Sequence, residues 1–321
     1  MIGAALPALA TRLGVGLILY AFSELIFVNE APAVALLALM DGSGAPGPIV
    51  MMIAWYTGFA AIFLAALRWR GPQGLIGLML AAMLAGWAIE ALLVPVVYEG
   101  PPVSFLWPSI GWHALIDIGL GWFGLRLALR HLALPLLLIV LSLAGIAWGI
   151  WSTWVLTDPE SASAAIPAAE FPAYAAAVAA LWIGGTILSD LAPPSPRAGR
   201  AELVFAALAS AGLFALTGLA FWPWALVLLA SVALVLAALR HAPDWGAGLL
   251  ARLENRPQPW RYLALPVMPV AAMLTYLWMI DSGRSVPVIP VAGALMTLGA
   301  LASAAALTAC AIAAARKWHR P

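Results

Sequence analysis

The sequence has few of the residues on which most soluble proteins and many metalloproteins depend. Only 9% of its 321 residues are charged, and it contains one cysteine and one lysine. The single cysteine, Cys310, excludes disulfides within the chain and thiolate zinc or iron–sulfur sites held by this chain alone. Lys317 lies in the C-terminal tail, so no lysine within an apolar segment can carry a retinal-type Schiff base, which excludes the opsins. The net charge of +1 indicates no nucleic-acid partner.

Apolar residues, in contrast, make up 64% of the chain. A soluble fold cannot hide so much apolar surface, whereas about 20 residues per membrane crossing would use most of the chain in about ten helices. We therefore expect an all-α, polytopic transmembrane helix bundle that forms a single membrane domain. Hydrophobic runs between turn and charge clusters predict the helices. They cover residues 13–40, 48–67, 74–97, 104–129, 132–155, 168–190, 203–221, 224–240, 262–281 and 286–315.

The first of these ranges is too long for a straight crossing. It contains Asn29, Glu30 and Pro32, so we expect it to tilt or to break near Pro32. No basic region precedes its apolar run and no small-residue cleavage site follows. We therefore interpret it as a first helix and not as a removed signal peptide.

The basic residues test the helix count. Every arginine and lysine except Arg284 lies in alternate connections between the predicted helices, at the helix ends beside those connections, or in the two ends of the chain. The positive-inside rule then places both termini in the cytoplasm. The excess of arginine over lysine, with abundant alanine and leucine, is typical of a GC-rich genome. We expect a multi-pass protein of the bacterial cytoplasmic (inner) membrane.

Ionisable residues inside apolar spans are costly and are therefore functional candidates. Glu24 lies roughly 16 Å along the first predicted helix, near the membrane midplane. Glu90 and His113 lie at the same depth, closer to the outer side of the membrane than Glu24. Asp117 lies about one helical turn deeper than His113, and Glu30 lies near the outer end of the first helix. These positions predict an acidic cluster that opens outward.

The helix over 104–129 carries a polar face. His113 and Asp117 are four residues apart, so both project from one side of the helix, and Ser109, Gly121 and Gly124 extend that side. A stripe of polar and small residues indicates contact with protein and not with lipid.

Helices one, three and four are predicted to converge on one outward-facing pocket. Its catalytic candidates are Glu90, His113, Asp117 and Glu24. Aromatic and polar neighbours of these residues are candidates for substrate binding. They are Trp87, Tyr20, Ser109, Trp112 and Glu30.

Two kinds of chemistry suit the acidic cluster. A buried carboxylic acid held neutral by desolvation and repulsion donates a proton, and His113 can accept or relay it. Alternatively, Glu90, His113 and Asp117, with Glu24, can hold a divalent metal such as zinc, manganese or iron. Against both stands a structural interpretation, in which His113 bonded to Asp117 or Glu90 simply fastens two helices.

Part of the sequence resembles a pattern in uncharacterised bacterial polytopic membrane proteins. The resemblance covers residues 86–90 (GWAIE), Tyr98 with Glu99, and residues 112–117 (WHALID). This resemblance implies no activity. More distantly, Trp87 and Glu90 followed by a short loop and an acid-bearing helix are similar to the integral-membrane terpene cyclases. That resemblance implies buried carboxyls that protonate an epoxide or olefin. In that family the Trp and Glu are adjacent, and this chain has more helices.

Three functions follow from these observations. The deep ionisable residues lie in residues 1–130, whereas residues 131–321 form an apolar helical scaffold. This asymmetry favours a membrane-embedded enzyme that acts on a lipid or isoprenoid-like substrate. The alternative is a proton- or cation-coupled transporter. Ten helices are also the general build of drug/metabolite transporters, and residues 180–186 (ALWIGGT) resemble one helix of that family, without a matching run in the first half. A third possibility is a non-catalytic membrane subunit or assembly factor.

Overall fold

A computed structural model describes residues 2–69, 74–92, 95–158, 161, 164–191 and 199–318. Within these ranges the regular structure is entirely helical, which confirms the all-α class. The side chain of Glu30, a predicted substrate-binding residue, lies outside the described residues. The backbone of Glu30 begins a helix.

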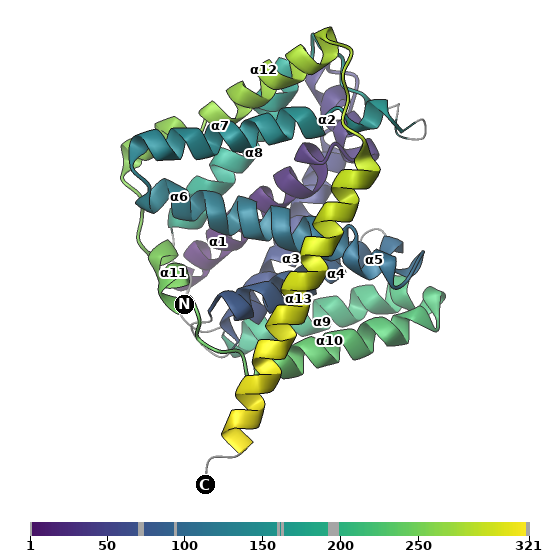
Figure 1. The fold of residues 1–321 in the computed structure, drawn as a ribbon, viewed down its shortest axis with the longest axis vertical. Coiled ribbons are helices and arrows are strands. Elements are labelled where there is room, and N and C mark those ends of the chain that lie inside the picture. Colours follow the sequence, from purple (N-terminus) through teal and green to yellow (C-terminus); the bar gives the residue numbers. More distant parts are fainter. Residues whose placement is uncertain are drawn as a thin grey trace. The chain divides into compact units, whose positions relative to one another are not determined.

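The helices follow one another in the order of Figure 1. In the first half they are α1 (Ile2–Tyr20), η1 (Ala21–Ile26), α2 (Glu30–Met40), α3 (Gly47–Arg68), α4 (Leu75–Leu92), η2 (Pro95–Tyr98), α5 (Val103–Leu106), η3 (Ser109–Gly124), α6 (Leu125–His131) and α7 (Leu134–Trp151). In the second half they are η4 (Trp154–Leu156), α8 (Phe171–Leu191), α9 (Arg200–Thr217), η6 (Gly218–Phe221), α10 (Trp224–Leu239), α11 (Ala247–Ala251), η7 (Arg252–Glu254), η8 (Pro259–Ala264), α12 (Val267–Asp281) and α13 (Val288–Trp318). The segments η1 and η3 are π-helices, and the other η segments are 3₁₀-helices.

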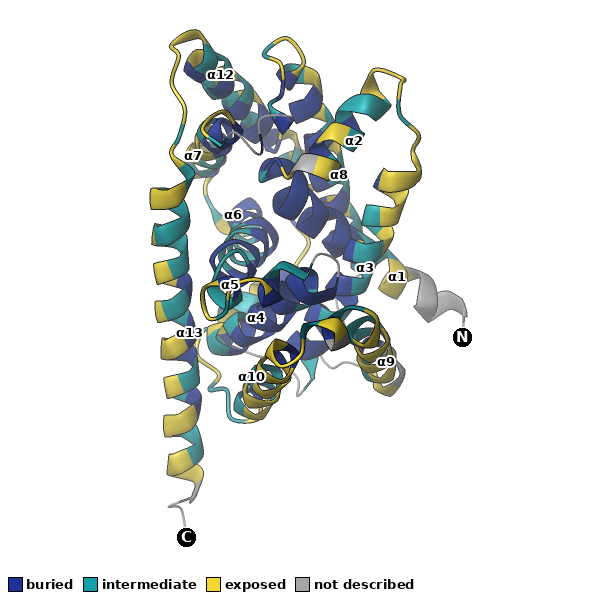
Figure 2. Ribbon diagram, turned by 90° about the vertical axis from the view of Figure 1, so that its right-hand side faces the viewer, coloured by how far each residue is buried: buried dark blue, intermediate teal, exposed yellow. Residues whose placement is uncertain are grey.

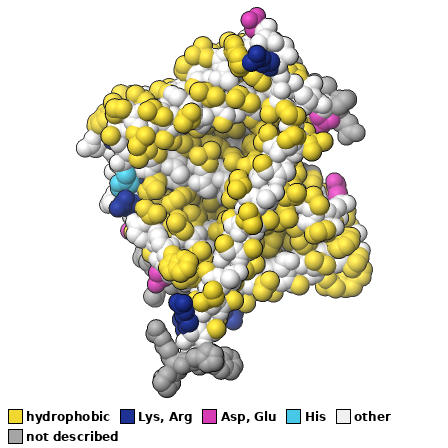
Figure 3. Space-filling view, in the orientation of Figure 1, with side chains coloured by type: hydrophobic (Ala, Val, Ile, Leu, Met, Phe, Trp, Pro, Cys, Tyr) yellow, Lys and Arg dark blue, Asp and Glu magenta, His cyan; other side chains and the backbone are white. Residues whose placement is uncertain are grey.

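Seven helical segments of the described chain are long and apolar enough to cross a membrane. They are Pro7–Ile26, Gly47–Arg68, Leu75–Leu92, Leu134–Leu156, Phe171–Leu191, Pro259–Asp281 and Val288–Lys317. The surface agrees with this, because hydrophobic side chains cover most of the face in Figure 3 and charged ones are few. Leu216 and Leu263 are each 81% exposed, which is costly in water and favourable in lipid. The chain is therefore a multi-pass membrane protein, while the orientation of its termini stays a prediction.

The chain divides into two compact units, each of which combines segments from both halves of the sequence. The predicted division at residue 130 describes where polar residues lie and stays a prediction. Unit 1 comprises residues 1–57, 120–192 and 255–291. In it α1 packs along α8, and α7 packs along α12. Glycines allow both contacts: a Cβ on Gly14 would lie 2.5 Å from the Ser189 nitrogen, and one on Gly145 would lie 2.1 Å from the Met268 carbonyl oxygen.

Unit 2 comprises residues 58–119, 193–254 and 292–321. Its central helix is α4, which packs against η2, α9 and α10. Figure 2 shows α4 mostly buried, whereas α9, α10 and α13 present long exposed faces. An apolar helix with one exposed face is typical of a membrane bundle, in which lipid covers that face.

The first predicted helix is broken, and the break ends three residues before Pro32. The π-helix η1 ends at Ile26, and α2 begins at Glu30. Between them Val28 has a φ of 62°, a left-handed conformation that is rare for a β-branched residue. Pro32 lies in the first turn of α2, where backbone N–H groups have no partner within the helix and a proline is tolerated. The predicted break near Pro32 is thus confirmed, and it lies at residues 27–29.

The helix predicted over 104–129 is also interrupted. The short α5 ends at Leu106, and the chain then turns at Trp107 and Pro108. The π-helix η3 begins directly after Pro108, whose carbonyl oxygen accepts hydrogen bonds from the backbone nitrogens of Trp112 (2.8 Å) and His113 (3.2 Å). π-Helical turns occur often at functional sites, and here they carry the predicted His113 and Asp117.

Candidate functional site

Three predicted catalytic residues of unit 2 meet in one network. His113 Nε2 lies 2.6 Å from Glu90 Oε1, and His113 Nδ1 lies 2.8 Å from Asp117 Oδ2. The imidazole is therefore held at both nitrogens between two carboxyl groups. Exposure falls along the network from 8% for Glu90 to 3% for His113 and 0% for Asp117. Glu90 is thus the member that another molecule reaches first.

The network depends on a close approach between α4 and η3. Gly86 lies one turn before Glu90, and a Cβ on Gly86 would lie 1.9 Å from the Ser109 carbonyl oxygen and 3.3 Å from the His113 Cβ. Only glycine allows this distance without displacement of the backbone. The spacing of Gly86 and Glu90 therefore places the carboxyl group opposite His113.

The loop between α4 and η3 is fixed by side-chain hydrogen bonds. Trp87 Nε1 donates to the Phe105 carbonyl oxygen (3.0 Å). Ser109 Oγ donates to the Ser104 carbonyl oxygen (3.1 Å), and Ser104 Oγ donates to the Val97 carbonyl oxygen (2.6 Å). These bonds give Trp87 and Ser109 a positioning role. Their predicted role in substrate binding stays a prediction.

Two further aromatic residues from the sequence patterns lie buried in this region. Trp112 is 4% exposed and contacts Trp107 edge to face, with ring centroids 6.3 Å apart. Tyr98 stacks on Phe221 at 5.0 Å. Burial raises the pKa of Tyr98 to about 12, so the phenol is protonated at neutral pH. No residue in the described part of the chain accepts or donates a hydrogen bond at its hydroxyl.

The arrangement suits proton transfer better than metal binding. The two ring nitrogens of His113 point in opposite directions, and a carboxyl group bonds each of them. Glu90 and Asp117 thus lie on opposite sides of the imidazole and do not surround one common point with it. Among the described residues no group of three such side chains has the arrangement of a metal site. The metal site stays a prediction that would require the network to rearrange.

An apolar cavity of about 580 Å³ lies in unit 2, and none of Glu90, His113 and Asp117 is part of its wall. Its wall includes Trp87, Ala88, Ala91 and Leu92 of α4, so the cavity adjoins the helical turn that carries Glu90. Helices α3, α9 and α10 form the other walls with mostly small and aliphatic side chains. Thr217 Oγ1 fastens α9 to α4 by a hydrogen bond to the Ala91 carbonyl oxygen (2.8 Å). A cavity of this size and polarity is typical of sites for apolar ligands.

Glu24 lies in unit 1 and has its own network. Its side chain is 4% exposed, and Tyr56 Oη donates a short hydrogen bond to its Oε1. Asn29 Nδ2 donates to its Oε2 (2.8 Å), and Ser23 Oγ lies 2.6 Å from Tyr56 Oη. The predicted convergence of Glu24 with the residues of unit 2 in one pocket stays a prediction.

Tyr20, predicted to line the substrate site, is completely buried one turn before Glu24. Its ring centroid lies 5.5 Å from that of Tyr56, and its hydroxyl has no hydrogen-bond partner among the described residues. An unsatisfied buried hydroxyl is costly, so this position favours a bound polar group or water near Tyr20.

The helix break after Glu24 is stabilised by tryptophans. The Phe27 carbonyl oxygen, which the break removes from helical bonding, accepts hydrogen bonds from Trp151 Nε1 (3.2 Å) and Trp154 Nε1 (2.6 Å). Both indole rings also contact the Phe27 ring, at 5.6 and 5.5 Å between centroids. The two indole N–H groups therefore satisfy the carbonyl oxygen that the break exposes.

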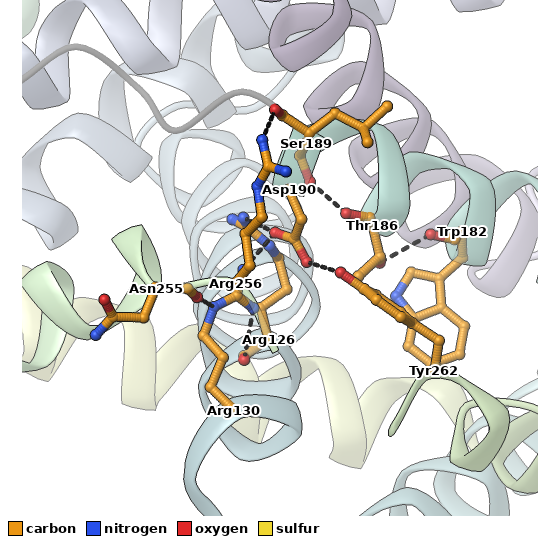
Figure 4. Close-up of polar contacts among 10 residues, drawn as sticks. Arg126, Arg130, Trp182, Thr186, Ser189, Asp190, Asn255, Arg256 and Tyr262 are labelled. Carbon is orange, nitrogen blue, oxygen red and sulfur yellow. Dashed lines mark hydrogen bonds and ion pairs between the residues drawn. The ribbon is translucent and has the colours of Figure 1, made fainter. Parts of the chain in front are cut away.

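A second ionic network of unit 1 was missed by the sequence reasoning. Asp190 is 6% exposed and accepts hydrogen bonds from Arg126 NH2 (2.6 Å), from Arg130 and from Tyr262 Oη (2.7 Å) (Figure 4). The sequence places Asp190 at a helix end and the arginines in connections. The one signal in the sequence was the spacing of Arg126 and Arg130, four residues apart, which does not identify their partner.

Comparison with known proteins adds no assignment: no family model, no curated protein and no solved structure matches this chain.

Proposed function

We propose that this protein is a membrane-embedded enzyme that carries out acid–base chemistry on a lipid or isoprenoid-like substrate entering from the outer leaflet. One observation carries the proposal. A single imidazole is bonded at both nitrogens by carboxyl groups, and the more accessible carboxyl, Glu90, lies on the helix that also forms a wall of the apolar cavity.

Glu90 is the proposed general acid. Its Oε1 is bonded to His113, whereas its Oε2 has no hydrogen-bond partner among the described residues and is not fully buried. Oε2 can therefore present a proton to a substrate. His113 Nε2–H then stabilises the carboxylate that forms at Oε1, and Asp117 accepts the hydrogen bond from Nδ1–H and stabilises the imidazolium.

The charges of this network suit a site of low dielectric. With Glu90 protonated, His113 as imidazolium and Asp117 ionised, the network is neutral. Transfer of the proton from Glu90 Oε2 to the substrate leaves a net charge of −1 opposite the cationic substrate. When the substrate later loses a proton to Glu90, the starting state is restored and no other reactant is needed. The neutral starting state avoids the large cost of an uncompensated buried charge.

The apolar cavity is the proposed binding site for the hydrocarbon part of the substrate. Trp87, which lines the cavity, lies one turn from Glu90. A chain in the cavity would lie within one helical turn of the acid, and its reactive double bond would have to reach past Trp87 to meet Glu90. Burial of the hydrocarbon chain would then orient the reacting group of the substrate.

The test uses the purified full-length protein in nanodiscs with a total bacterial lipid extract. Liquid chromatography coupled to mass spectrometry, which separates isomers of equal mass, compares lipid species after incubation with wild type, Glu90→Gln and Glu99→Gln. Glu99 is an exposed acid of the same unit and serves as the matched control. We expect one lipid species to be consumed by wild type and Glu99→Gln but not by Glu90→Gln. Consumption by all three proteins would reject Glu90 as the acid, and a loss of thermal stability alone would favour the structural clamp.

Proton- or cation-coupled transport is a second candidate, favoured by the broken helix beside Glu24. Discontinuous helices next to a buried carboxyl are typical of coupling-ion sites in transporters. In this protein Tyr56 and Asn29 hold both carboxyl oxygens directly before the break. Uptake by proteoliposomes that is insensitive both to a collapsed proton gradient and to cation replacement would reject this candidate.

A further inference from the structure

The Asp190 network of unit 1 lies outside the proposed reaction and has an unusual charge balance. Arg126 and Asp190 have side chains that are 4% and 3% exposed, and the Arg130 side chain is 2% exposed. Two buried guanidiniums thus share one carboxylate. Figure 4 shows Arg256 beside them, where it donates a hydrogen bond to the Leu191 carbonyl oxygen.

A fourth arginine completes the group. Arg261 donates hydrogen bonds to the carbonyl oxygens of Leu129 and Leu132, at the C-terminal end of α6. Arg130 also donates to the Asn255 carbonyl oxygen (2.8 Å), which ties α6 to the segment that carries Arg256 and Arg261. The arginine cluster is defined here as Arg126, Arg130, Arg256 and Arg261.

The positive charge of the arginine cluster exceeds what the protein supplies to balance it. Asp190 contacts two of the four guanidiniums, Arg126 and Arg130, and the other two contact carbonyl oxygens at the C-terminal ends of α6 and α8. Each helix end contributes roughly −0.5 charge, so an excess of roughly +2 remains. Asp190 is the only acid in the three chain segments that form the cluster, which are 125–134, 186–191 and 255–266, and the acid next to the last segment, Glu254, is exposed. This excess matches the charge of one phosphate group.

Several guanidinium groups still have hydrogen atoms to donate. A guanidinium carries five N–H groups, and within the described chain Arg256 uses one of them and Arg261 uses two. Arg126 Nε is buried and has no hydrogen-bond partner among the described residues. Arg256 is exposed and Arg261 is half-buried, so an anion can reach both of them.

The position of the cluster along the chain favours a membrane-surface ligand. Asp190 is the penultimate residue of the span Phe171–Leu191, and Arg261 is the third residue of the span Pro259–Asp281. Both therefore lie where an apolar span ends, which is the depth of lipid headgroups. Trp260, 48% exposed and 5.5 Å from the Arg261 guanidinium, is typical of a residue anchored at that depth.

We infer that the arginine cluster is a binding site for a phosphate-bearing anion. Arg256 and Arg261 bind it directly, and Arg126 and Arg130 supply buried positive charge that Asp190 and Tyr262 hold in place. The chemistry is that of a phosphate oxygen accepting charge-assisted hydrogen bonds from guanidinium groups. The phosphate belongs either to an anionic lipid headgroup or to free phosphate.

The test measures the melting temperature of the full-length protein in phosphatidylcholine nanodiscs. One series adds phosphatidylglycerol and the other adds inorganic phosphate. The variants are Arg256→Gln and Arg256→Gln/Arg261→Gln, and Arg284→Gln is the control, because Arg284 is an exposed arginine of the same unit outside the cluster. The readout is the anion-dependent rise in melting temperature, so a lower starting stability of a variant does not obscure it.

We expect a saturable rise in wild type and in Arg284→Gln, with half-saturation shifted about tenfold or more upward in Arg256→Gln. A rise with phosphatidylglycerol alone identifies the lipid headgroup, and a rise with inorganic phosphate alone identifies free phosphate. No saturable rise in wild type, or equal shifts in Arg256→Gln and Arg284→Gln, would overturn the inference.

Discussion

The His113 network of unit 2 and the Asp190 network of unit 1 are opposite in composition. The first sets two carboxyl groups against one imidazole, and the second sets two guanidiniums against one carboxyl group. Carboxyl and imidazole groups can gain or lose protons, so the first network can adjust its charge. Arginine is effectively always protonated, so the charge of the second is fixed. A buried network that can change its protonation suits catalysis, whereas a fixed one suits structure and anion binding.

The largest expected effect is a loss of activity, without a matching loss of stability, when an acid of the His113 network is replaced. Asp117→Asn removes the carboxylate that stabilises the imidazolium but leaves Glu90 to hold His113. We expect turnover of the lipid substrate to fall by about 100- to 10,000-fold, measured in nanodiscs by liquid chromatography coupled to mass spectrometry. The free energy of unfolding should change by less than about 1.5 kcal/mol, because an amide still accepts the hydrogen bond. Normal turnover with a large loss of stability would reverse the assigned roles.

Replacing the acid of the Asp190 network by its amide should instead lower the stability of the protein. Asp190→Asn leaves Arg126 and Arg130 buried without a compensating charge, and we expect a loss of about 3–5 kcal/mol of stability. Unfolding of the purified protein in mixed micelles measures it. Asp281→Asn, which removes an exposed acid of the same unit, is the control and should stay within about 0.5 kcal/mol. Equal stability of the two variants would show that Asp190 does not balance the arginines.

A smaller effect tests how Asp190 is held. Tyr262→Phe removes one hydrogen bond to the carboxylate, at 2.7 Å, and leaves both arginines in place. We expect a loss of about 1.5–3 kcal/mol in the same unfolding assay, because the acceptor is charged. A change as large as that of Asp190→Asn would mean that Tyr262, and not the charge balance, dominates the network.

The smallest expected effect concerns the helix break next to Glu24. Trp151→Phe keeps the ring contact with Phe27 but removes one of the two indole hydrogen bonds to its carbonyl oxygen. Trp154 still satisfies that oxygen, so we expect a loss of about 1 kcal/mol or less in the same assay. A loss of several kcal/mol would show that the break depends on both indoles.

Much of this architecture could be predicted because the membrane imposes strong rules on sequence. Every predicted helix range contains a helix, and the i, i+4 spacing of His113 and Asp117 with Glu90 at the same depth correctly indicated a shared network. Hydrophobic periodicity does not distinguish α from π turns, so the π-helical form of η3 was not foreseen. The position of the first break depended on Trp151 and Trp154, which lie more than 120 residues away in the sequence.

The Asp190 network could not be predicted for a similar reason. Its members come from three segments that only the fold brings together, and each looks like an ordinary charge at a helix end. The positive-inside pattern explains the arginines without any partner. Only their burial, with side chains 2–4% exposed, shows that they are part of the protein interior.

The central claim, that Glu90 transfers a proton to a lipid, is tested most directly by isotope incorporation. The lipid extract is incubated in D₂O with wild type, Glu90→Gln or Glu99→Gln. The lipids are then returned to H₂O, and their masses are measured by mass spectrometry. The account predicts deuterium retained on carbon in one lipid species with wild type and Glu99→Gln, and none with Glu90→Gln. Equal deuterium with Glu90→Gln, or no retained deuterium with wild type, would contradict it.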